Sequence, residues 1–569
     1  MGGETMAENW PAMSIAEVNA LLTAPGAPFE METVEIAGRP TRSWKNAPPT
    51  LQHCFAAGRA HGDRIFLVHE GERVSFEGFA RATIRLAGHF RSLGVAAGDR
   101  IAIAMRNVPE WPVAFYAGQL LGAIVTPLNA WWTGAELEYG LSDSGAKLLV
   151  TDGERWERIA PHRAALPELK HVLVSRGGDG SLEAAIGTPE SWGDLPDLPT
   201  PAPFLNPDDD ATIFYTSGTT GKPKGALGSH RNICSNVMAG AFSGARSFLR
   251  RGEMPPQPDP AAPQKATLLS VPFFHATGCH AVLNPSLVGG ARLVMQRKFD
   301  AGDALRLIEA ERITSAGGVP TIAWQILTHP DRDKYDISSL ETISYGGAPS
   351  APELVRQIGA AGSAPGNGWG MTETSATFCH HMAEDYLNRP DSCGPPVPVC
   401  DAEVRDPDGK VLGPDQVGEL YGFGPNIVKG YWNKPEATAE TFPGGWVRTG
   451  DLARIDSEGF VTIVDRAKDM LIRGGENIYC VEVEGILCEH PAVMDAALVG
   501  RPHHVLGEEP VAFVSTKPHM QVGEEELQAF AAERLARFKV PVEIFVRHQP
   551  LPRNANGKIL KNELKKEVA

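Results

Sequence analysis

The chain has 569 residues, which is too many for one hydrophobic core, so we expect two or more domains. Its 69 acidic and 53 basic residues give a net charge of −16, which argues against nucleic acid or an anionic membrane surface as a partner. Eight scattered cysteines without CxxC spacing indicate free thiols in a reducing compartment, and we recognise no signal peptide. We therefore expect a cytoplasmic protein. Its oligomeric state stays open, with a homodimer as one alternative.

The first segment, up to about Pro49, is rich in Pro, Gly and polar residues, so we expect it to cover the surface. A helix is predicted next, because Phe79, Leu86 and Phe90 recur at helical spacing and Gly94 follows as a stop. Residues 251–265 contain many prolines and are predicted to form a surface loop.

An uncharged stretch, residues 111–132, is long enough to span a bilayer. Pro112, Gln119 and Pro127 interrupt it, and Gly122 separates a helical half from a β-like half. This pattern favours a buried helix followed by a buried strand over a membrane span.

Short apolar runs alternate with helical stretches along most of the chain, which is typical of an α/β fold with mostly parallel sheets flanked by helices. After Pro395 the strands become shorter and are separated by turns, which predicts a β-rich subdomain. The last hundred residues begin a new α+β pattern. We therefore predict a large N-terminal domain over residues 1–465 and a small, mobile C-terminal domain over residues 466–569. The predicted strands are Ile101–Met105, Ile124–Leu128, Leu148–Val150, Val172–Val174, Ile213–Tyr215, Leu268–Val271 and Ile343–Tyr345.

The strongest motif is the string Thr216–Gly225, TSGTTGKPKG, which follows a predicted strand. Its hydroxyls, glycines and two lysines can surround phosphate oxygens with backbone N–H groups and positive charge. It is not a Walker loop, because GxxxxGK[ST] is absent. A generic loop of this composition would more often be a mobile surface segment.

With this string the chain resembles the acyl-adenylate-forming (ANL) superfamily, which includes acyl- and aryl-CoA ligases, firefly luciferase and peptide-synthetase adenylation domains. The resemblance covers nearly the whole chain, because further motifs follow in the family's order. These are Val271–His275, Tyr345–Pro349, Asn367–Glu373, Trp446–Asp451, Asp465–Asp469 and Pro552–Lys558.

The resemblance implies an AMP-forming acyl-CoA ligase that uses ATP, Mg²⁺ and coenzyme A. Carboxylate and ATP would give acyl-AMP and pyrophosphate, and the thiol of coenzyme A would then take the acyl group. A free-standing adenylating enzyme that loads a carrier protein or forms an amide is the alternative. A non-enzymatic ATP-binding protein would be expected to lack Lys558 or Glu373, and both are present.

The resemblance also implies the nucleotide site. Small residues at 346–348 and 368–370 would let backbone close on both faces of the purine, and Trp369 stands where the family usually has Tyr. Asp451 would accept the ribose hydroxyls. The ATP- and AMP-binding candidates are Thr216, Ser217, Gly218, Thr219, Thr220, Gly221, Lys222, Lys224, Gly347, Ala348, Pro349, Asn367, Gly368, Trp369, Gly370, Met371, Asp451 and Arg466.

Four candidate catalytic residues follow from the same resemblance: Lys558, Thr372, Glu373 and His275. Glu373 would be the Mg²⁺ ligand and Thr372 would bond the α-phosphate. Lys558 would bridge the acyl carboxylate and the α-phosphate, and His275 would border the carboxylate. Outside these motifs, the same residues would be read as a solvated Glu, a surface Lys and a core His. Lys468 matches the hinge about which the small domain rotates.

Candidate acyl-pocket residues lack any Lys or Arg, so we expect a monocarboxylic acid with a neutral apolar tail: fatty, alicyclic, steroid side-chain or aromatic. They are His275, Ala276, Gly278, Val319, Gly346 and Gly370. For coenzyme A the candidates are Gly474, Gly475 and Glu476. One departure from the family pattern is Cys480, where Pro is usual. We assign the remaining histidines structural roles, including His280, His380, His381, His503 and His504.

Overall fold

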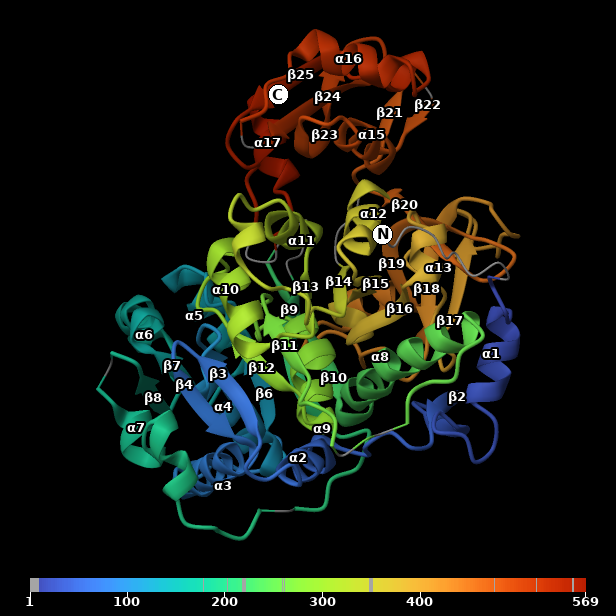
Figure 1. Ribbon diagram of the computed structural model, residues 1–569. Helices are drawn as coiled ribbons and strands as arrows, with labels where there is room; N and C mark the ends of the chain where they lie inside the picture. Colours follow the sequence, from blue (N-terminus) through green and yellow to red (C-terminus); the bar gives the residue numbers. More distant parts are fainter. Residues whose placement is uncertain are drawn as a thin grey trace.

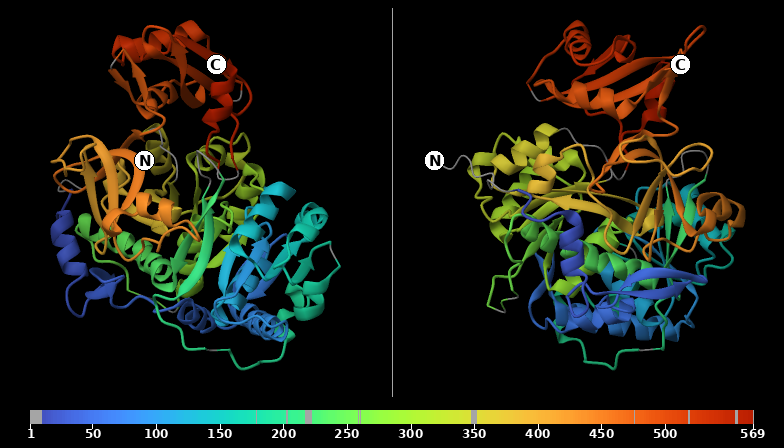
Figure 2. Two further views of the ribbon diagram at one scale, coloured as in Figure 1. Left: turned by 180° about the vertical axis from the view of Figure 1, so that it is seen from behind. Right: turned by 90° about the vertical axis from the view of Figure 1, so that its right-hand side faces the viewer.

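The computed structural model describes residues 10–177, 179–201, 203–216, 222–257, 259, 261–346, 352–474, 476–517, 519–554 and 557–568. A large body carries the first part of the chain, and a smaller body, formed after residue 470, sits over one of its ends (Figure 1). The two further views give the same arrangement (Figure 2).

One sheet of the large body has the strand order β10-β9-β6-β5-β7-β8. Its strands run parallel except β10, which pairs antiparallel with β9. Helices follow the parallel strands, as the alternating pattern predicts. The strands are β5 (Arg100–Ala104), β6 (Ile124–Pro127), β7 (Leu148–Asp152), β8 (His171–Ser175), β9 (Asp210–Thr216) and β10 (Lys224–Ser229); the helices are α3 (Phe76–Ser92), α4 (Glu110–Leu120), α5 (Gly134–Ser144), α6 (Gly153–Ile159) and α7 (Ser181–Ile186).

A second sheet has the order β16-β15-β14-β13-β11-β12-β3-β4 and is parallel except at its two edge strands. Its strands are β3 (Ile65–His69), β4 (Glu72–Ser75), β11 (Ala266–Leu269), β12 (Arg292–Met295), β13 (Ser315–Gly318), β14 (Thr342–Gly346), β15 (Ala364–Met371) and β16 (Ala376–Met382). The accompanying helices are α2 (Leu51–Arg59), α8 (His230–Arg250), the π-helix Thr277–Leu283, α9 (Asn284–Gly289), α10 (Ala301–Glu311), α11 (Pro320–Leu327), α12 (Pro352–Ala360) and α13 (Glu384–Asn388).

Helix α4 lies in the core of the large body, and every one of its residues is buried. Trp111 stacks on Phe115 and Phe273 with ring centroids 5.4 and 5.0 Å apart. The uncharged stretch is therefore a buried helix followed by β6, as predicted. Among the described helices none is long and apolar enough to span a membrane.

The N-terminal segment does more than cover the surface, because Val18 and Trp44 belong to a core cluster with Phe242 of α8. The Trp44 and Phe242 rings lie 5.5 Å apart. This segment holds α1 (Ile15–Leu22), β1 (Met31–Ile36) and β2 (Arg39–Trp44). The loop 251–265 has neither helix nor strand in its described residues, as predicted.

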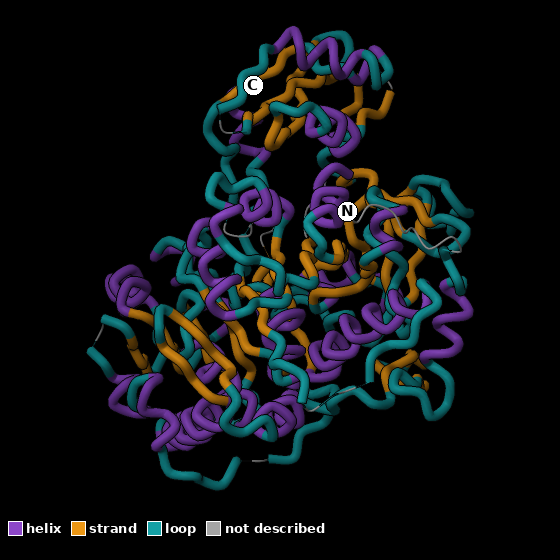
Figure 3. The backbone as a smooth tube through the Cα atoms, viewed as in Figure 1, coloured by secondary structure: helices purple, strands orange, loops and turns teal. Residues whose placement is uncertain are grey.

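The β-rich subdomain predicted after Pro395 is an antiparallel sheet of order β17-β18-β19-β20. The small body contains an antiparallel sheet of order β22-β21-β24-β23, and β25 pairs parallel with β24. Figure 3 shows helices over this sheet. The elements are β17 (Asp401–Arg405), β18 (Gly418–Phe423), α14 (Pro435–Thr441), β19 (Val447–Ile455) and β20 (Val461–Arg466), then β21 (Leu471–Arg473), β22 (Glu476–Ile478), α15 (Cys480–Cys488), β23 (Val493–His503), β24 (Gly507–Thr516), α16 (Glu524–Ala532), β25 (Glu543–Arg547) and α17 (Lys561–Val568).

Candidate active site

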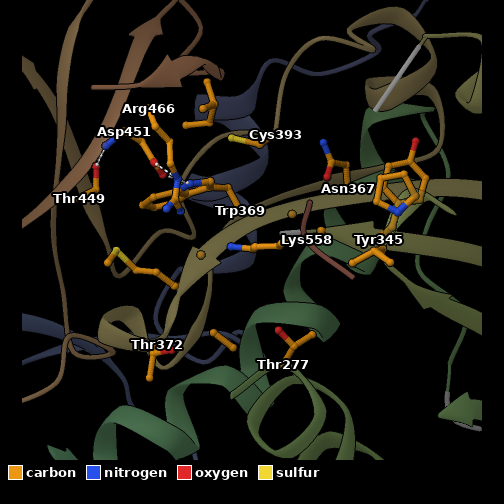
Figure 4. Close-up of a pocket in the computed structure, with 18 of the residues that line it drawn as sticks. Thr277, Tyr345, Asn367, Trp369, Thr372, Cys393, Thr449, Asp451, Arg466 and Lys558 are labelled. Atoms are coloured by element: carbon orange, nitrogen blue, oxygen red, sulfur yellow. Dashed lines mark hydrogen bonds and ion pairs between the residues drawn. The ribbon is translucent and has the colours of Figure 1, made fainter. Parts of the chain in front are cut away.

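A cleft of about 2270 Å³ opens where the small body meets the large one, and residues of both bodies line it (Figure 4). It lies beyond the carboxyl ends of β11, β13, β14 and β15, which is where open α/β sheets usually bind ligands.

At one side of the cleft, Asp451 is held by two donors from different strands. The indole Nε1 of Trp369 donates to Oδ2 at 2.9 Å, and Nε of Arg466 lies 3.1 Å from Oδ1 (Figure 4). Arg466 stands directly opposite Asp451 in the β19/β20 pair, so the sheet register creates this ion pair. Phe378 packs edge-on against Trp369 with centroids 5.7 Å apart and helps fix the indole. Asp451 is therefore a rigid, acceptor-rich group at the cleft surface.

Glu373 is a second carboxylate of the cleft and is only 5% exposed. Burial raises its pKa, while a hydrogen bond from the Tyr431 hydroxyl to Oε1, at 2.6 Å, acts in the opposite direction. The ammonium of Lys224 lies 4.8 Å from the Tyr431 ring centroid. The described residues contain no cluster of three or more His, Cys, Asp or Glu side chains that could hold a metal. A cation at Glu373 would thus need ligands from a bound substrate.

The predicted phosphate loop joins β9 to β10, whose ends Thr216 and Lys224 are paired in register. Both residues line the cleft, together with Lys222. Lys222 lies over the Tyr139 ring at 5.0 Å from its centroid. Two ammonium groups therefore stand at the described end of this hairpin.

Lys558 enters the cleft from the small body (Figure 4). Its main-chain N–H donates to Oδ1 of Asn554 at 3.0 Å, and Arg553 binds both the Gly557 carbonyl and Asp495, so the described residues around Lys558 are fixed. Burial lowers the pKa of Lys558 to about 8, and the charge of Arg466 acts in the same direction. The carboxylates of Asp451 and Glu373 oppose that shift. Lys558 is thus a desolvated cation within electrostatic range of the large body's acidic groups.

The imidazole of His275 is neutral at physiological pH, because burial and the nearby Lys558 lower its pKa to about 3. Its buried Nε2 has no hydrogen-bond partner in the described structure. A neutral ring beside a cation can border a ligand carboxylate without adding charge.

The remaining side of the cleft is lined by one face of the second sheet and by α8 and the π-helix. Gly346, Gly368 and His380 are in register across β14, β15 and β16. Asn236 and Gly240 of α8 also line this part. None of these residues is a Lys or an Arg, and Gly346 among them is a predicted acyl-pocket residue.

Most candidate residues meet in this one cleft. They are Thr216, Lys222, Lys224, His275, Ala276, Val319, Gly346, Asn367, Gly368, Trp369, Gly370, Met371, Thr372, Glu373, Asp451, Arg466, Lys468 and Lys558. A further set lies outside the described residues: Ser217, Gly218, Thr219, Thr220, Gly221, Gly347, Ala348, Pro349 and Gly475.

Three candidates do not line the cleft. Gly278 is buried, and a Cβ on it would lie 2.1 Å from the Pro272 carbonyl oxygen, so it packs against the chain instead of facing a ligand. Gly474 and Glu476 belong to the β21–β22 hairpin of the small body. The small body presents Lys558 to the cleft instead of this hairpin. Gly474 and Glu476 thus lie outside the cleft that Lys558 lines.

The predicted hinge residue, Lys468, lies in the link between β20 and β21. Cys480, where the family usually has Pro, donates its N–H to Oδ2 of Asp465 at 2.5 Å and its thiol to the Asp469 carbonyl at 3.0 Å. A proline could not make the first bond. These bonds tie the start of α15 to the last strand of the large body.

Sequence reasoning did not single out Tyr431 or assign His380 to the cleft. Tyr431 follows a turn 58 residues after Glu373, and no local pattern links the two. His380 is paired with Gly368 across β15 and β16, so both lie on the same face of the sheet. Once this pairing is known, the sequence places His380 in the cleft.

A family model described as "AMP-binding enzyme" matches residues 54–432, and "AMP-binding enzyme C-terminal domain" matches residues 482–558. The chain is 35% identical over 501 residues to a feruloyl-CoA synthase of Amycolatopsis sp, covering 88% of this chain and 94% of that protein. It is 33% identical over 545 residues to a long-chain-fatty-acid–CoA ligase of Bacillus subtilis (strain 168), covering 91% and 94%.

Solved structures are similar over the same length. The o-succinylbenzoate coenzyme A synthetase of Bacillus subtilis, in complex with ATP and magnesium ion, matches with a TM-score of 0.75 and 30% identity, covering 90% of this chain and 99% of that one. ATP-bound MatB from Rhodopseudomonas palustris matches with a TM-score of 0.77 and 28% identity, covering 90% and 98%.

Proposed function

This chain belongs to the family of AMP-binding enzymes, and on that premise we propose that it is an AMP-forming acyl-CoA ligase. The observation that carries the proposal is the position of Lys558: a lysine of the small body lies in one cleft with Asp451 and Glu373 of the large body. A lysine with only a surface role would not lie, partly buried, in a cleft beside the acidic groups of another body.

In the first step, the acyl carboxylate attacks the α-phosphorus of ATP, and pyrophosphate leaves. Asp451 accepts the ribose hydroxyls, and Lys222 and Lys224 attract the phosphates. Lys558 lies between two anions that would otherwise repel each other, so its charge stabilises their approach. Thr372 donates a hydrogen bond to the α-phosphate.

Mg²⁺ fits this site through Glu373. A single desolvated carboxylate, combined with phosphate oxygens and water, is a ligand set that this ion prefers. When bound, the ion offsets negative charge on the phosphates. Tyr431 keeps the Glu373 carboxylate oriented through its hydrogen bond.

In the second step, the coenzyme A thiol attacks the acyl-adenylate carbonyl and AMP leaves. We propose that the small domain, residues 466–569, rotates about Lys468 between the two steps. Rotation would replace Lys558 by the β21–β22 hairpin, whose described residues Gly474 and Glu476 do not line the cleft in the present arrangement.

As substrate we propose a monocarboxylic acid with a largely apolar tail. The acyl side of the cleft presents Ala276, Val319 and Gly346, and basic side chains are absent from the described acyl-pocket candidates. An amino acid or a diacid would bring a second charge without a partner there, which is costly.

The test is an acid panel with ATP and Mg²⁺, followed by pyrophosphate release with and without coenzyme A. The proposal expects acid-dependent pyrophosphate release and, with coenzyme A, an acyl-CoA product. If amines accept the acyl group and form amides, and coenzyme A gives no acyl-CoA, the amide-forming alternative is favoured instead.

A further inference from the structure

The imidazole of His380 lines the acyl side of the cleft and has no hydrogen-bond partner among the described residues. Its Nδ1 is fully buried, and the ring makes no side-chain hydrogen bond there. Nε2 is not among the fully buried atoms and has no hydrogen-bond partner among the described residues, so this nitrogen is open to the cleft. A ligand in the cleft can therefore bond Nε2 without displacing a protein partner.

Backbone geometry holds this ring against the cavity wall. His380 stands opposite Gly368 in the β15–β16 pair, so both face the same side of the sheet. A Cβ on Gly368 would lie 3.1 Å from Cδ2 of His380, so the glycine leaves room for the ring. From Gly368 to Thr372, where the adenylate forms in our proposal, the strand advances about 13 Å at ~3.3 Å per residue. A ligand atom near His380 is therefore remote from the carboxylate.

The protonation state of the ring follows from its surroundings. Burial and the charge of Arg246 lower the pKa of His380 to about 4, so the ring is neutral at physiological pH. Arg246 donates to the main-chain oxygen of His380, and Nδ1 is the ring nitrogen nearer the main chain. A positive charge on that side favours the lone pair on Nδ1 and the proton on Nε2.

Neighbouring polar groups of this part of the cleft already have partners. Asn236 accepts the Thr377 N–H at 2.8 Å, and the Ser270 hydroxyl donates to the Gly317 carbonyl. His381, the next residue, lies on the opposite face and is fully buried; its Nε2 lies 2.9 Å from the Ser392 carbonyl oxygen, and its Nδ1 has no partner among the described residues. His380 is different because its ring faces the ligand cavity.

We propose that Nε2–H of His380 donates a hydrogen bond to an oxygen atom on the acyl tail, far from the carboxylate. The preferred substrates are then monocarboxylic acids whose apolar tail carries a hydroxyl, ether or carbonyl oxygen, in place of plain hydrocarbon acids. This inference rests on the proposed ligase function and narrows its substrate class.

The experiment is a competition between matched acids that differ only in the tail oxygen, such as decanoic acid with its ω-hydroxy derivative and cinnamic acid with para-hydroxycinnamic acid. Each pair is incubated with enzyme, ATP, Mg²⁺ and coenzyme A, and mass spectrometry measures the acyl-CoA ratio. That ratio is independent of how much of a variant is correctly folded. In the pair of acids that the enzyme accepts better, we expect the acyl-CoA of the oxygenated acid to exceed that of the plain acid about fivefold or more.

His380→Leu should abolish this preference, His380→Gln should restore part of it, and His504→Leu, at an exposed histidine of the small body, should leave it unchanged. A wild-type enzyme without preference, or a His380→Leu enzyme that keeps it, would overturn the inference while leaving the ligase function intact. If no acid releases pyrophosphate, the proposed function fails, and this inference fails with it.

Discussion

Trp369 and Asp451 lie 82 positions apart in the chain, yet the Trp369 indole N–H donates to the Asp451 carboxylate at 2.9 Å. The opposite carboxylate oxygen faces Arg466 at 3.1 Å. Because both oxygens are fixed, the carboxylate has a defined orientation before any nucleotide binds. The tyrosine usual in the family has no N–H at this place, so the arrangement depends on the tryptophan.

Trp369→Phe should therefore weaken ATP binding more than it slows turnover. The phenyl ring keeps an aromatic surface for the purine but loses the hydrogen bond to a charged acceptor, which is worth about 1.5–3 kcal/mol at most. With Arg466 still in place, we expect KM for ATP to rise about tenfold and kcat to change by less than about twofold.

Discrimination between ATP and 2′-deoxy-ATP gives the specific readout, since the ratio of their kcat/KM values should fall in Trp369→Phe. An unchanged ratio together with a general loss of activity would mean that the indole has only a packing role.

Removing the charge at Glu373 should abolish most adenylation. Glu373→Gln is nearly isosteric, so we expect the thermal unfolding temperature to stay near wild type and pyrophosphate release to fall about a hundredfold or more. Full activity of this variant at ordinary Mg²⁺ would remove Glu373 from the metal site.

Tyr431→Phe probes the same carboxylate through its pKa. The Tyr431 hydrogen bond lowers the Glu373 pKa, so its loss should raise that pKa further above the ordinary value. More of the carboxyl is then protonated at mildly acidic pH. The acidic limb of the kcat/KM profile should move to higher pH in this variant, and an unmoved limb would contradict the assignment.

Deprotonation of Lys558 should cause a loss of kcat/KM at alkaline pH. Its folded pKa of about 8 lies below the ordinary value of 10.5, so the free enzyme loses the catalytic charge above pH 8. The kcat/KM for ATP should therefore fall as pH rises through about 8, while kcat persists to higher pH, because bound phosphates favour the ammonium.

The deprotonation of Lys558 should affect stability in the opposite direction: activity falls as pH rises, whereas the free energy of unfolding increases. A lysine whose folded pKa is lowered binds fewer protons in the native state than in the unfolded state between about pH 8 and 10.5. Its burial penalty is complete below that window and is relieved as pH rises through it. Lys558→Met should flatten this part of the stability curve; an unchanged curve would show that Lys558 is not desolvated in solution.

Cys480→Pro should shift the balance between the two domain orientations. The substitution restores the usual family residue but removes the N–H that bonds Asp465, a nearly fully buried carboxylate. We expect the present orientation to be less populated, so that acyl-AMP formation slows several-fold while thioester formation from acyl-AMP does not. Cys480→Ser, which keeps the N–H, is the matched control and should behave as wild type.

Much of the architecture could be predicted from the sequence, because the repeating apolar runs and helical stretches are local signals. The buried α4–β6 pair and the free thiols followed from composition and spacing, and both are found. The nucleotide motifs likewise carry their residues in short strings, and most of these residues meet in one cleft.

Long-range pairings could not be predicted. The Tyr431–Glu373 and Cys480–Asp465 bonds depend on how strands and turns of different elements are juxtaposed. The small size of Gly278 predicts an acyl-pocket position, but the sequence does not reveal that a side chain there would point at the Pro272 carbonyl. For His380, the deciding fact is the register with Gly368, which belongs to the folded sheet.

The most direct measurement of the central claim separates the two half-reactions of a Lys558→Ala enzyme. Lys558 lies in the cleft with Asp451 and Glu373, whereas the Gly474 hairpin lies outside it, so the lysine should serve only the first step. We expect pyrophosphate release from acid and ATP to fall by about a hundredfold to a thousandfold, by analogy with the loss of other electrostatic transition-state donors. The same preparation, given synthetic acyl-AMP and coenzyme A, should form thioester at a rate near wild type. A parallel loss of both half-reactions, or of neither, would contradict the account.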